Sequence, residues 1–237
     1  MDNTIYAALA RQSGLMQEMQ VVANNMANVN TTGFRREGVV FSEYVDSLDG
    51  NEASLSMAHA SGRTIDFEAG AIASTGNQLD FAIQGKGYFM VETPEGNQLT
   101  RAGSFLRSPE GELVTPEGFR VLDNGGSAIF LPADQGPIAV GEDGTLSAKG
   151  QPLAQLGLYE PQNSTTISLQ AGTRFAVPEG TVPAENARVM QGVVEQSNVD
   201  PVREIARMVE VQRAYELGQT FLDREDERIR SVISTLK

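Results

Sequence analysis

The chain has 237 residues with 31 acidic and 18 basic side chains, so its formal net charge is −13. This balance disfavours nucleic acids and anionic membranes as partners, because both select for surfaces rich in lysine and arginine. Cysteine is absent and His59 is the only histidine, which excludes disulfides, thiolate metal sites, cysteine nucleophiles and multi-histidine metal sites.

Residues 1–35 are expected to form an amphipathic helix that ends at a turn. Its stripe steps by four and three residues, close to the heptad spacing of a coiled coil. The stripe consists of Ile5, Leu9, Gln12, Met16, Met19, Ala23 and Met26, flanked by Leu15, Val22 and Val29. Turn formers and a glycine at residues 30–33 end the helix. The opening residues lack the basic and apolar regions of a secretory signal peptide, so we expect none.

Residues 36–60 are mixed and polar with no clear period, and we interpret them as a linker or an extended arm. His59 lies there without recognisable partners, so we expect it to be solvated. Formal charge is spread unevenly, because residues 31–199 carry −11 whereas residues 1–30 and 200–237 carry −1 each. Nearly neutral ends can pack against copies of themselves without large repulsion, and an acidic middle suits a solvated exterior.

Residues 61–196 have the pattern of an all-β domain of short strands and hairpins, large enough to bury its own core. The candidate strands are Leu79–Ile83, Tyr88–Glu92, Gln98–Arg101, Ser104–Leu106, Glu112–Val114 and Phe119–Leu122. Four turns share the tripeptide Pro-Glu-Gly, at residues 94–96, 109–111, 116–118 and 178–180. Proline presets φ at the second turn position, and glycine can take the positive φ that closes a hairpin.

Three motifs that could carry chemistry are better explained as structure. The run Gly85-Lys86-Gly87 lacks the Ser or Thr and the upstream glycine of a phosphate-binding loop, so we expect a hairpin turn. Residues 123–126 lack the spaced carboxylates of a calcium loop, so we expect another turn. Arginines interleave the acidic residues 223–227, which favours a solvated helix face or an inter-subunit ion-pair network. We therefore expect no catalytic residue, metal, cofactor or small-molecule substrate.

Residues 197–237 carry a stronger helix signal than the N-terminal segment. Asp200 before Pro201 is an N-cap followed by proline at the first helical position. The stripe that follows consists of Ile205, Met208, Gln212, Tyr215, Gln219, Leu222, Asp226, Ile229, Ile233 and Leu236. Its polar members recur every seven residues, as do the polar residues that fix register at coiled-coil seams. They could also be exposed flanks of one core-packed helix, but a helix of roughly 55 Å needs partners along its length.

The predicted fold is therefore α+β, with a helix at each end and an all-β domain between them. The two terminal helices are expected to pair with each other as a coiled coil, because both need such partners. No apolar stretch reaches about 18 residues, so we expect the chain not to be membrane-inserted.

Three segments together resemble the signatures of bacterial flagellar rod and hook proteins. They are residues 22–35 (VANNMANVNTTGFR), residues 76–89 (GNQLDFAIQGKGYF) with 100–105 (TRAGSF), and residues 197–200 (SNVD) with 212–216 (QRAYE). Within that family, the length and the opening residues 1–6 (MDNTIY) are most like the proximal rod proteins. Distal rod proteins often carry an insertion near residues 36–60, where this chain is short.

The resemblance implies a structural subunit that catalyses no reaction. Family members are exported unfolded through the flagellar type III apparatus, and they polymerise with copies of themselves and other rod proteins into a hollow periplasmic rod. The rod transmits motor torque, with the terminal helices in an inner coiled-coil layer and the β domain outside. One alternative is a distal rod protein of the same family. Two alternatives of a different class are a transient rod-assembly scaffold or chaperone and a peptidoglycan hydrolase.

The assembly interface implied by the resemblance and the helical stripes draws on both ends of the chain. It comprises Ile5, Leu9, Gln12, Met16, Met19, Val22, Asn24, Asn25, Met26, Asn28, Asn30, Gly33, Phe34, Ile205, Met208, Gln212, Arg213, Tyr215, Gln219, Leu222, Ile229, Ile233 and Leu236. Its asparagines are expected to cap helices or to hydrogen-bond across them, and Gly33 to form the turn out of the inner layer. Because the terminal helices lack partners before assembly, we expect them to be largely disordered in the monomer.

Overall fold

A computed structural model describes residues 2–46, 55–132, 136–163, 165–170 and 172–235 of the chain, excluding some side chains in residues 2–4, 42–46 and 55–61. The fold is α+β, with one long helix near each end and a β-rich centre. The chain forms two compact units: residues 1–29, 36–67 and 199–237 make the first, and residues 30–35 and 68–198 make the second.

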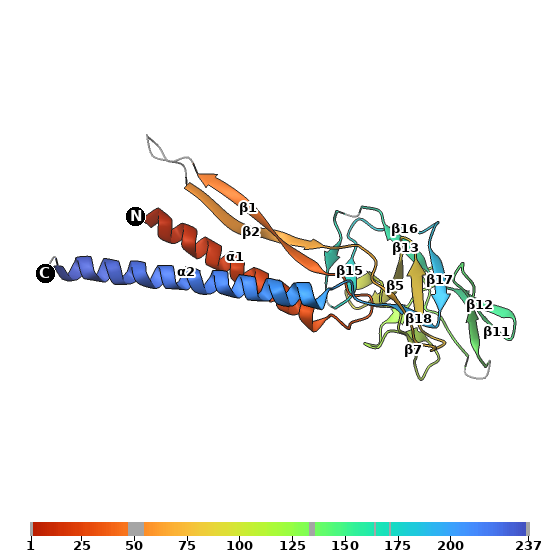
Figure 1. The fold of residues 1–237 in the computed structure, drawn as a ribbon. Helices are drawn as coiled ribbons and strands as arrows, with labels where there is room; N and C mark the ends of the chain where they lie inside the picture. Colours follow the sequence, from red (N-terminus) through yellow and green to blue (C-terminus); the bar gives the residue numbers. More distant parts are fainter. Residues whose placement is uncertain (1, 47–54, 133–135, 164, 171, 236–237) are drawn as a thin grey trace. The chain divides into compact units, whose positions relative to one another are not determined.

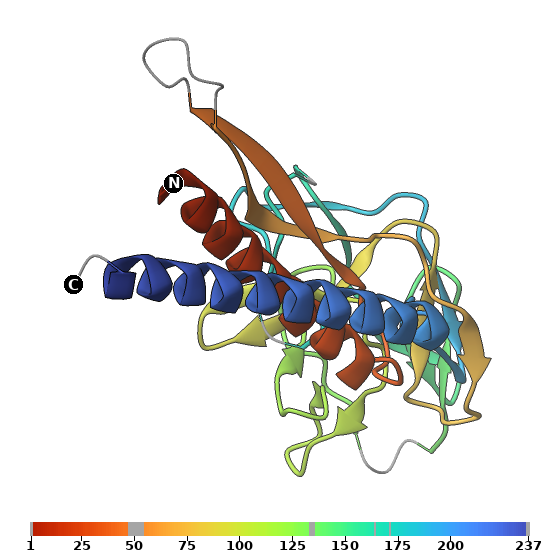
Figure 2. The same cartoon turned by 60° about the vertical axis from the view of Figure 1, so that its left-hand side comes forward.

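The first unit, which we call the helical unit, contains two helices and a two-stranded sheet. Its elements are α1 (Asp2–Ala27), β1 (Glu37–Asp46), β2 (Leu55–Ile65) and α2 (Pro201–Thr235). The two helices contact each other and lie side by side in Figure 1, and the turned view of Figure 2 shows that they cross at an angle. The strands pair antiparallel from Glu37 opposite Ile65 to Asp46 opposite Leu55, with a register shift between Val40 and Phe41. The segment interpreted as an arm thus contains β1 and the start of β2.

The predicted start of the C-terminal helix is confirmed at atomic detail. Asp200 Oδ1 accepts hydrogen bonds from the backbone N–H groups of Val202 (2.9 Å) and Arg203 (3.3 Å), as an N-cap side chain does. The α-helix then begins at Pro201 and continues for 35 residues, which is about 52 Å. It ends at Thr235, so Leu236 lies outside the described residues.

The second unit, which we call the β unit, is built from short strands. They are β3 (Ile72–Ser74), β4 (Phe81–Gln84), β5 (Tyr88–Thr93), β6 (Gly96–Thr100), β7 (Leu106–Arg107), β8 (Leu113–Val114), β9 (Arg120–Val121), β10 (Ile138–Val140), β11 (Thr145–Ala148), β12 (Gln151–Gln155), β13 (Leu158–Pro161), β14 (Ser168–Leu169), β15 (Arg174–Ala176), β16 (Thr181–Pro183), β17 (Arg188–Gln191) and β18 (Val193–Glu195). The largest sheet has the order β14-β15-β6-β5-β9-β8-β7, and β13 joins it by pairing with both β5 and β16. Smaller sheets are β10-β11-β12, β17-β4 and β18-β3.

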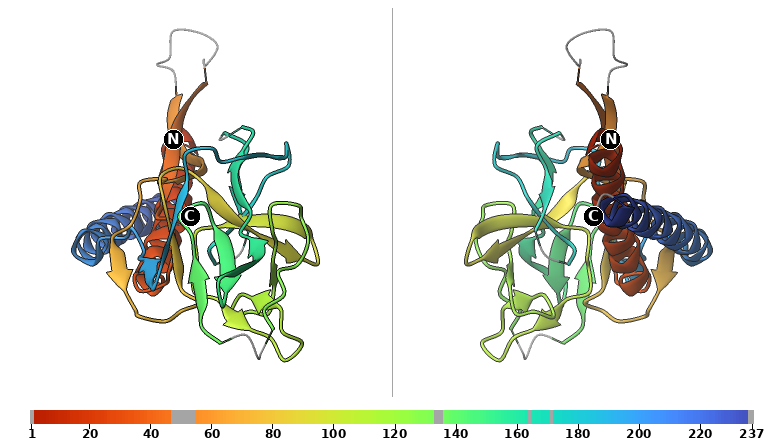
Figure 3. Two further views of the ribbon diagram at one scale, coloured as in Figure 1. Left: turned by 90° about the vertical axis from the view of Figure 1, so that its right-hand side faces the viewer. Right: turned by 90° about the vertical axis from the view of Figure 1, so that its left-hand side faces the viewer.

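The strands of the β unit enclose one apolar core, and Figure 3 shows them from two sides. Phe81, Phe89 and Phe105 are fully buried at its centre, and the rings of Phe89 and Phe105 meet edge to face with centroids 5.2 Å apart. The other core members are Ile83, Val91, Leu113, Val121, Ile129, Leu131, Leu146, Leu156, Leu158 and Val189. This core confirms that the central region buries enough apolar surface to fold around itself.

The Pro-Glu-Gly turns form as predicted. Their glycines all take positive φ, from 87° at Gly180 to 112° at Gly96. In three of them the glycine N–H closes the turn on the carbonyl three residues earlier, as Gly118 does on Thr115 at 2.9 Å. Left-handed φ at this position favours glycine, which is why the tripeptide marks each turn.

Candidate functional site

The face of α2 that packs within the helical unit follows a strict four–three spacing. Its buried or half-buried positions are Glu204, Met208, Val211, Tyr215, Gly218, Leu222 and Glu225, with Ala214 beside them. Three of these, Met208, Tyr215 and Leu222, belong to the predicted stripe. The others lie one residue before the predicted positions, so Gln212, Gln219 and Asp226 are exposed in the single chain.

Gln12 is the seam residue of α1 that contacts the middle of α2. Its Nε2 donates to the Tyr215 carbonyl at 3.0 Å, and the residue is only 9% exposed. Gly218 makes room for it, because a Cβ there would lie 3.0 Å from the Gln12 amide. Sequence reasoning missed Gly218, because glycine is a poor helix former and only the contact with Gln12 gives it a role here.

Glu18 and Arg207 link the two helices about two turns further along. Arg207 Nη2 lies 2.5 Å from Glu18 Oε1 and Arg207 Nη1 lies 3.1 Å from Glu210 Oε2. Burial by itself lowers the pKa of the Arg207 guanidinium, but the hydrogen bonds and charges of the two glutamates outweigh it and raise that pKa. Arg207 therefore stays charged at any physiological pH.

Asn25 is fully buried in the helical unit and makes three hydrogen bonds. Its Nδ2 donates to the Glu37 carbonyl (2.8 Å) and to Glu204 Oε2 (3.2 Å), and its Oδ1 accepts from the Glu37 N–H (2.9 Å). Arg36 Nε pairs with the second oxygen of the Glu204 carboxylate at 2.6 Å. One amide thus joins α1, the start of β1 and the start of α2.

These contacts fix the relative direction of the two helices. Moving along α1 from Gln12 to Glu18 to Asn25, the partners on α2 move back from Tyr215 to Arg207 to Glu204, so the helices are antiparallel. Since α1 begins ten residues before Gln12, its start lies opposite about residue 225. The rest of α2 has no part of α1 beside it.

The predicted interface residues divide into two groups in the single chain. Buried or half-buried are Ile5, Gln12, Met19, Val22, Asn25, Met26, Asn28, Gly33, Phe34, Met208, Tyr215 and Leu222. Exposed are Leu9, Met16, Asn24, Asn30, Ile205, Gln212, Arg213, Gln219, Ile229 and Ile233. Among the asparagines, Asn25 bonds across helices, whereas Asn28 Nδ2 donates back to the Asn24 carbonyl at 2.9 Å.

Both helices also present large apolar side chains to solvent, which we call the open stripes. On α1 these are Tyr6, Leu9 and Met16, and on α2 they are Val202, Ile205, Val209, Leu217, Phe221, Ile229, Val232 and Ile233. They are 40–74% exposed, with Val202 and Leu217 at the upper end. Five of the eight α2 members, Val202, Val209, Leu217, Phe221 and Val232, were missed, because they lie beside the stripe that the heptad pattern selected.

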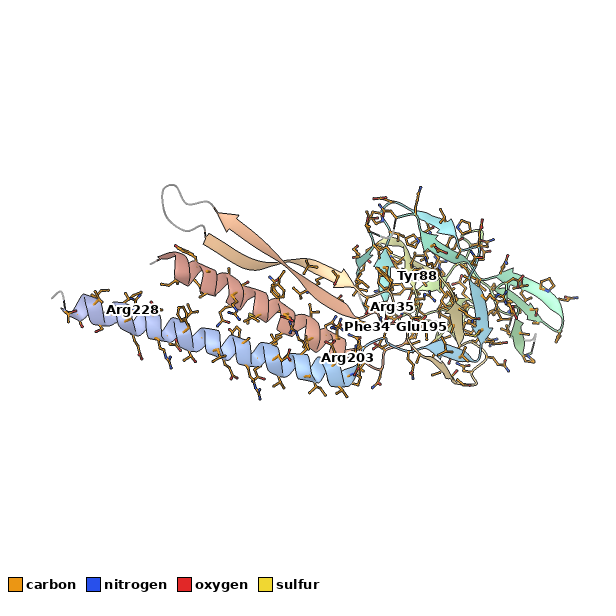
Figure 4. The ribbon with its side chains drawn as sticks, turned by 45° about the horizontal axis from the view of Figure 1, so that its top comes forward. Phe34, Arg35, Tyr88, Glu195, Arg203 and Arg228 are labelled. Atoms are coloured by element: carbon orange, nitrogen blue, oxygen red, sulfur yellow. The ribbon has the colours of Figure 1, made fainter. Side chains whose placement is uncertain are left out.

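The β unit holds a second polar network, centred on Glu195. Its Oε1 lies 2.6 Å from Arg35 Nη2 and its Oε2 lies 3.3 Å from Arg101 Nη1, and all three side chains are at most 6% exposed. Arg101 also donates to the carbonyls of Ile83 (2.9 Å) and Gly85 (2.6 Å). Figure 4 shows Arg35 and Glu195 together beside Phe34 and Tyr88.

Tyr88 packs its ring against the Arg101 guanidinium, whose carbon lies 5.2 Å from the ring centroid. Burial raises the pKa of the Tyr88 phenol, and the positive charge of Arg101 only partly opposes that shift. Burial likewise lowers the pKa of the Arg101 guanidinium, while the Glu195 carboxylate opposes the change.

Residues 123–126 form a turn as predicted, in which Gly126 donates its N–H to the Asp123 carbonyl at 3.0 Å. Gly85 and Gly87 have positive φ, but the run Gly85-Lys86-Gly87 does not form the predicted hairpin turn, because β4 pairs with β17 and β5 pairs with β6, β9 and β13. Within the acidic cluster of α2, Arg228 pairs with Glu225 and Arg230 with Asp226. No group of three or more His, Asp or Glu placed to hold a metal ion occurs among the described residues. In the same part of the chain, no helix is long and apolar enough to cross a membrane.

Three family descriptions match successive parts of the chain. Residues 5–35 match the flagella basal body rod protein family, residues 82–148 the flagellar hook protein FlgE/F/G D1 domain, and residues 190–235 the flagellar basal body rod FlgEFG protein C-terminal region. The flagellar basal-body rod protein FlgF of Caulobacter vibrioides is 37% identical, and the match covers 100% of this chain and 98% of that protein. FlgF of Mesorhizobium japonicum is 37% identical over 91% of this chain and 90% of its own length. FlgG of Bacillus subtilis is 30% identical over 98% of both chains.

Proposed function

The chain belongs to the flagellar basal-body rod protein family and is most like FlgF, and from this premise we infer how it works as a structural subunit of the rod. It is not an enzyme, and its place is the flagellar basal body. The observation that carries the inference below is the pair of open stripes on α1 and α2.

We propose that α1 and α2 pair as a coiled coil and that the open stripes pack against neighbouring subunits. Large apolar side chains that remain exposed in rows along a helix mark surfaces that a partner covers. The helical ends carry little net charge, so copies can approach closely there. The partners in this proposal are other copies of the chain and other rod proteins. Contacts between unlike surfaces that do not close into a ring produce an open helical assembly.

We further propose that the chain reaches the periplasm unfolded, through the flagellar type III export apparatus. The absence of cysteine suits passage into an oxidising compartment, because no wrong disulfide can form on the way. Refolding then depends on contacts made at the assembly site. After assembly, the asparagine contacts and the seam residues of the predicted interface hold the helices in register.

The test replaces two open-stripe residues that contribute little to the fold of the single chain. In Leu217→Gln with Phe221→Gln, we expect the purified protein to keep its unfolding midpoint. In cells, the same double variant should leave basal bodies without complete rods, as seen by electron microscopy. The matched control is Thr220→Ser, at an exposed position between the two that belongs to neither the predicted interface nor the open stripes. Normal rods in the double variant would contradict the proposal, and absence of the protein from purified basal bodies would favour a transient scaffold.

A further inference from the structure

Residues 30–35 form a short excursion of the chain into the β unit, and we call them the plug. The chain leaves the helical unit after residue 29 and returns to it at residue 36. It passes into the β unit again after residue 67 and leaves it after residue 198. Each of α1, β1, β2 and α2 is therefore connected along the chain to a point at which the chain enters or leaves the β unit.

The plug is held in the β unit by burial and by backbone bonds. Phe34 and Arg35 are each 1% exposed. The Gly33 N–H donates to the Glu195 carbonyl at 2.8 Å, and the Asn198 N–H donates to the Phe34 carbonyl at 3.4 Å. Gly33 has φ +69° and lies against the backbone of Ala102 so closely that no side chain fits there. A side chain at position 33 would therefore collide with that backbone.

The Arg35 guanidinium bonds to the segments at the other two passages. Its Nη2 pairs with Glu195, three residues before the last passage, and its Nη1 donates to the Glu68 carbonyl, the first residue after the middle passage. Glu195 in turn accepts from the Gly70 N–H at 3.0 Å and from Arg101. The buried Arg35–Glu195 ion pair and its hydrogen bonds thus connect the plug to the segments at residues 68–70 and at Glu195 within the β unit.

We propose that Arg35 and Glu195 are positioning residues for torque transmission, anchoring in the β unit all the segments that lead to α1, β1, β2 and α2. The proposal rests on the rod-subunit function given above. The guanidinium of Arg35 is planar and rigid, and its N–H donors point in several directions. In a buried site, such a group resists displacement of its bonded partners in more than one direction. A buried ion pair is a poor source of net stability compared with apolar packing, so its value here is the geometry it imposes.

Limited trypsin digestion tests the anchoring directly, because trypsin cleaves after arginine and Arg35 is the last residue of the plug. In the native full-length protein, cleavage after Arg35 should be slow. In Glu195→Gln, which weakens the pair while keeping the shape, we expect cleavage to be faster by about tenfold or more, since the plug opens more often. The control is Glu142→Gln, which weakens the exposed Arg188–Glu142 pair of the same unit. Equal cleavage rates in the two variants would overturn the anchoring.

Motility under load tests the mechanical role. Cells carrying Glu195→Gln or Arg35→Lys should assemble rods in normal number, yet lose swimming speed more steeply than wild type as viscosity rises. The Glu142→Gln strain should follow the wild-type curve. Wild-type load curves in both anchor variants, with intact rods, would overturn the positioning role while leaving the rod-subunit function standing. Rods that form without the gene would instead remove that function.

Discussion

At the scale of single residues, Asn25 shows how one amide fixes several elements. Its donors and its acceptor are all used in a site without solvent, where a lost bond leaves a buried partner unsatisfied. Asn25→Asp would place a carboxylate beside the buried Glu204 carboxylate. We expect the free energy of unfolding in urea, followed by circular dichroism, to fall by about 1–3 kcal/mol. Asn24→Asp, one residue away and exposed, should change little, and equal losses in the two variants would contradict this role.

Ionisation of the Tyr88 phenol is expected to lower the stability of the folded protein at alkaline pH. Its pKa is raised by burial above the value of about 10 in the unfolded chain, so the folded state favours the neutral phenol. The stabilisation is complete below pH 10 and is lost as pH rises toward the folded pKa. Between pH 9 and 11, the melting temperature of Tyr88→Phe should therefore fall less steeply than that of wild type. Tyr6→Phe, at a position 63% exposed, serves as the control and should follow the wild-type slope.

At the scale of elements, local signals in the sequence predicted most of the architecture. The Asp200-Pro201 cap and the Pro-Glu-Gly turns are short-range features, so residues a few positions apart suffice to specify them. The predicted stripe of α2 differs from the observed packing face by one residue at every second position. The reason is that Glu204 and Gly218 lie in the seam, and neither looks like a seam residue until its partner, Asn25 or Gln12, is known.

The Arg35–Glu195–Arg101 network lay beyond sequence reasoning for a related reason. Phe34 was singled out as part of the signature, but the role of Arg35 depends on an ion pair with a residue 160 positions away. Nothing in composition or spacing links two such positions. The β1–β2 hairpin was also missed as a sheet, because residues 36–60 show no period of two.

The two halves of α2 should differ in stability. Its buried residues, Glu204 and Val211, are both in the first half, and the start of α1 lies opposite about residue 225. Amide hydrogen exchange in the monomer should therefore be fast from about residue 226 onward and slower near Val211. In the unassembled chain, we therefore expect disorder of the C-terminal helix to begin in its second half. Uniform protection along the whole helix would contradict it.

At the scale of the whole molecule, charge and burial assign different tasks to different parts of the chain. The middle carries −11 of the −13 charges and has an apolar core of its own, whereas the ends are nearly neutral and leave apolar rows exposed. A chain with this division can remain dissolved through its middle and associate through its ends. Family membership identifies the assembly as the basal-body rod.

The most direct test of this account is to delete the gene in its host and to image purified basal bodies by electron microscopy. Complementation would use the full chain and a variant that lacks residues 200–237. The account predicts that rod and hook fail to form without the gene, that the full chain restores them, and that the truncated variant does not. Normal rods and hooks in the deletion strain would contradict the central claim that this chain is a structural subunit of the rod.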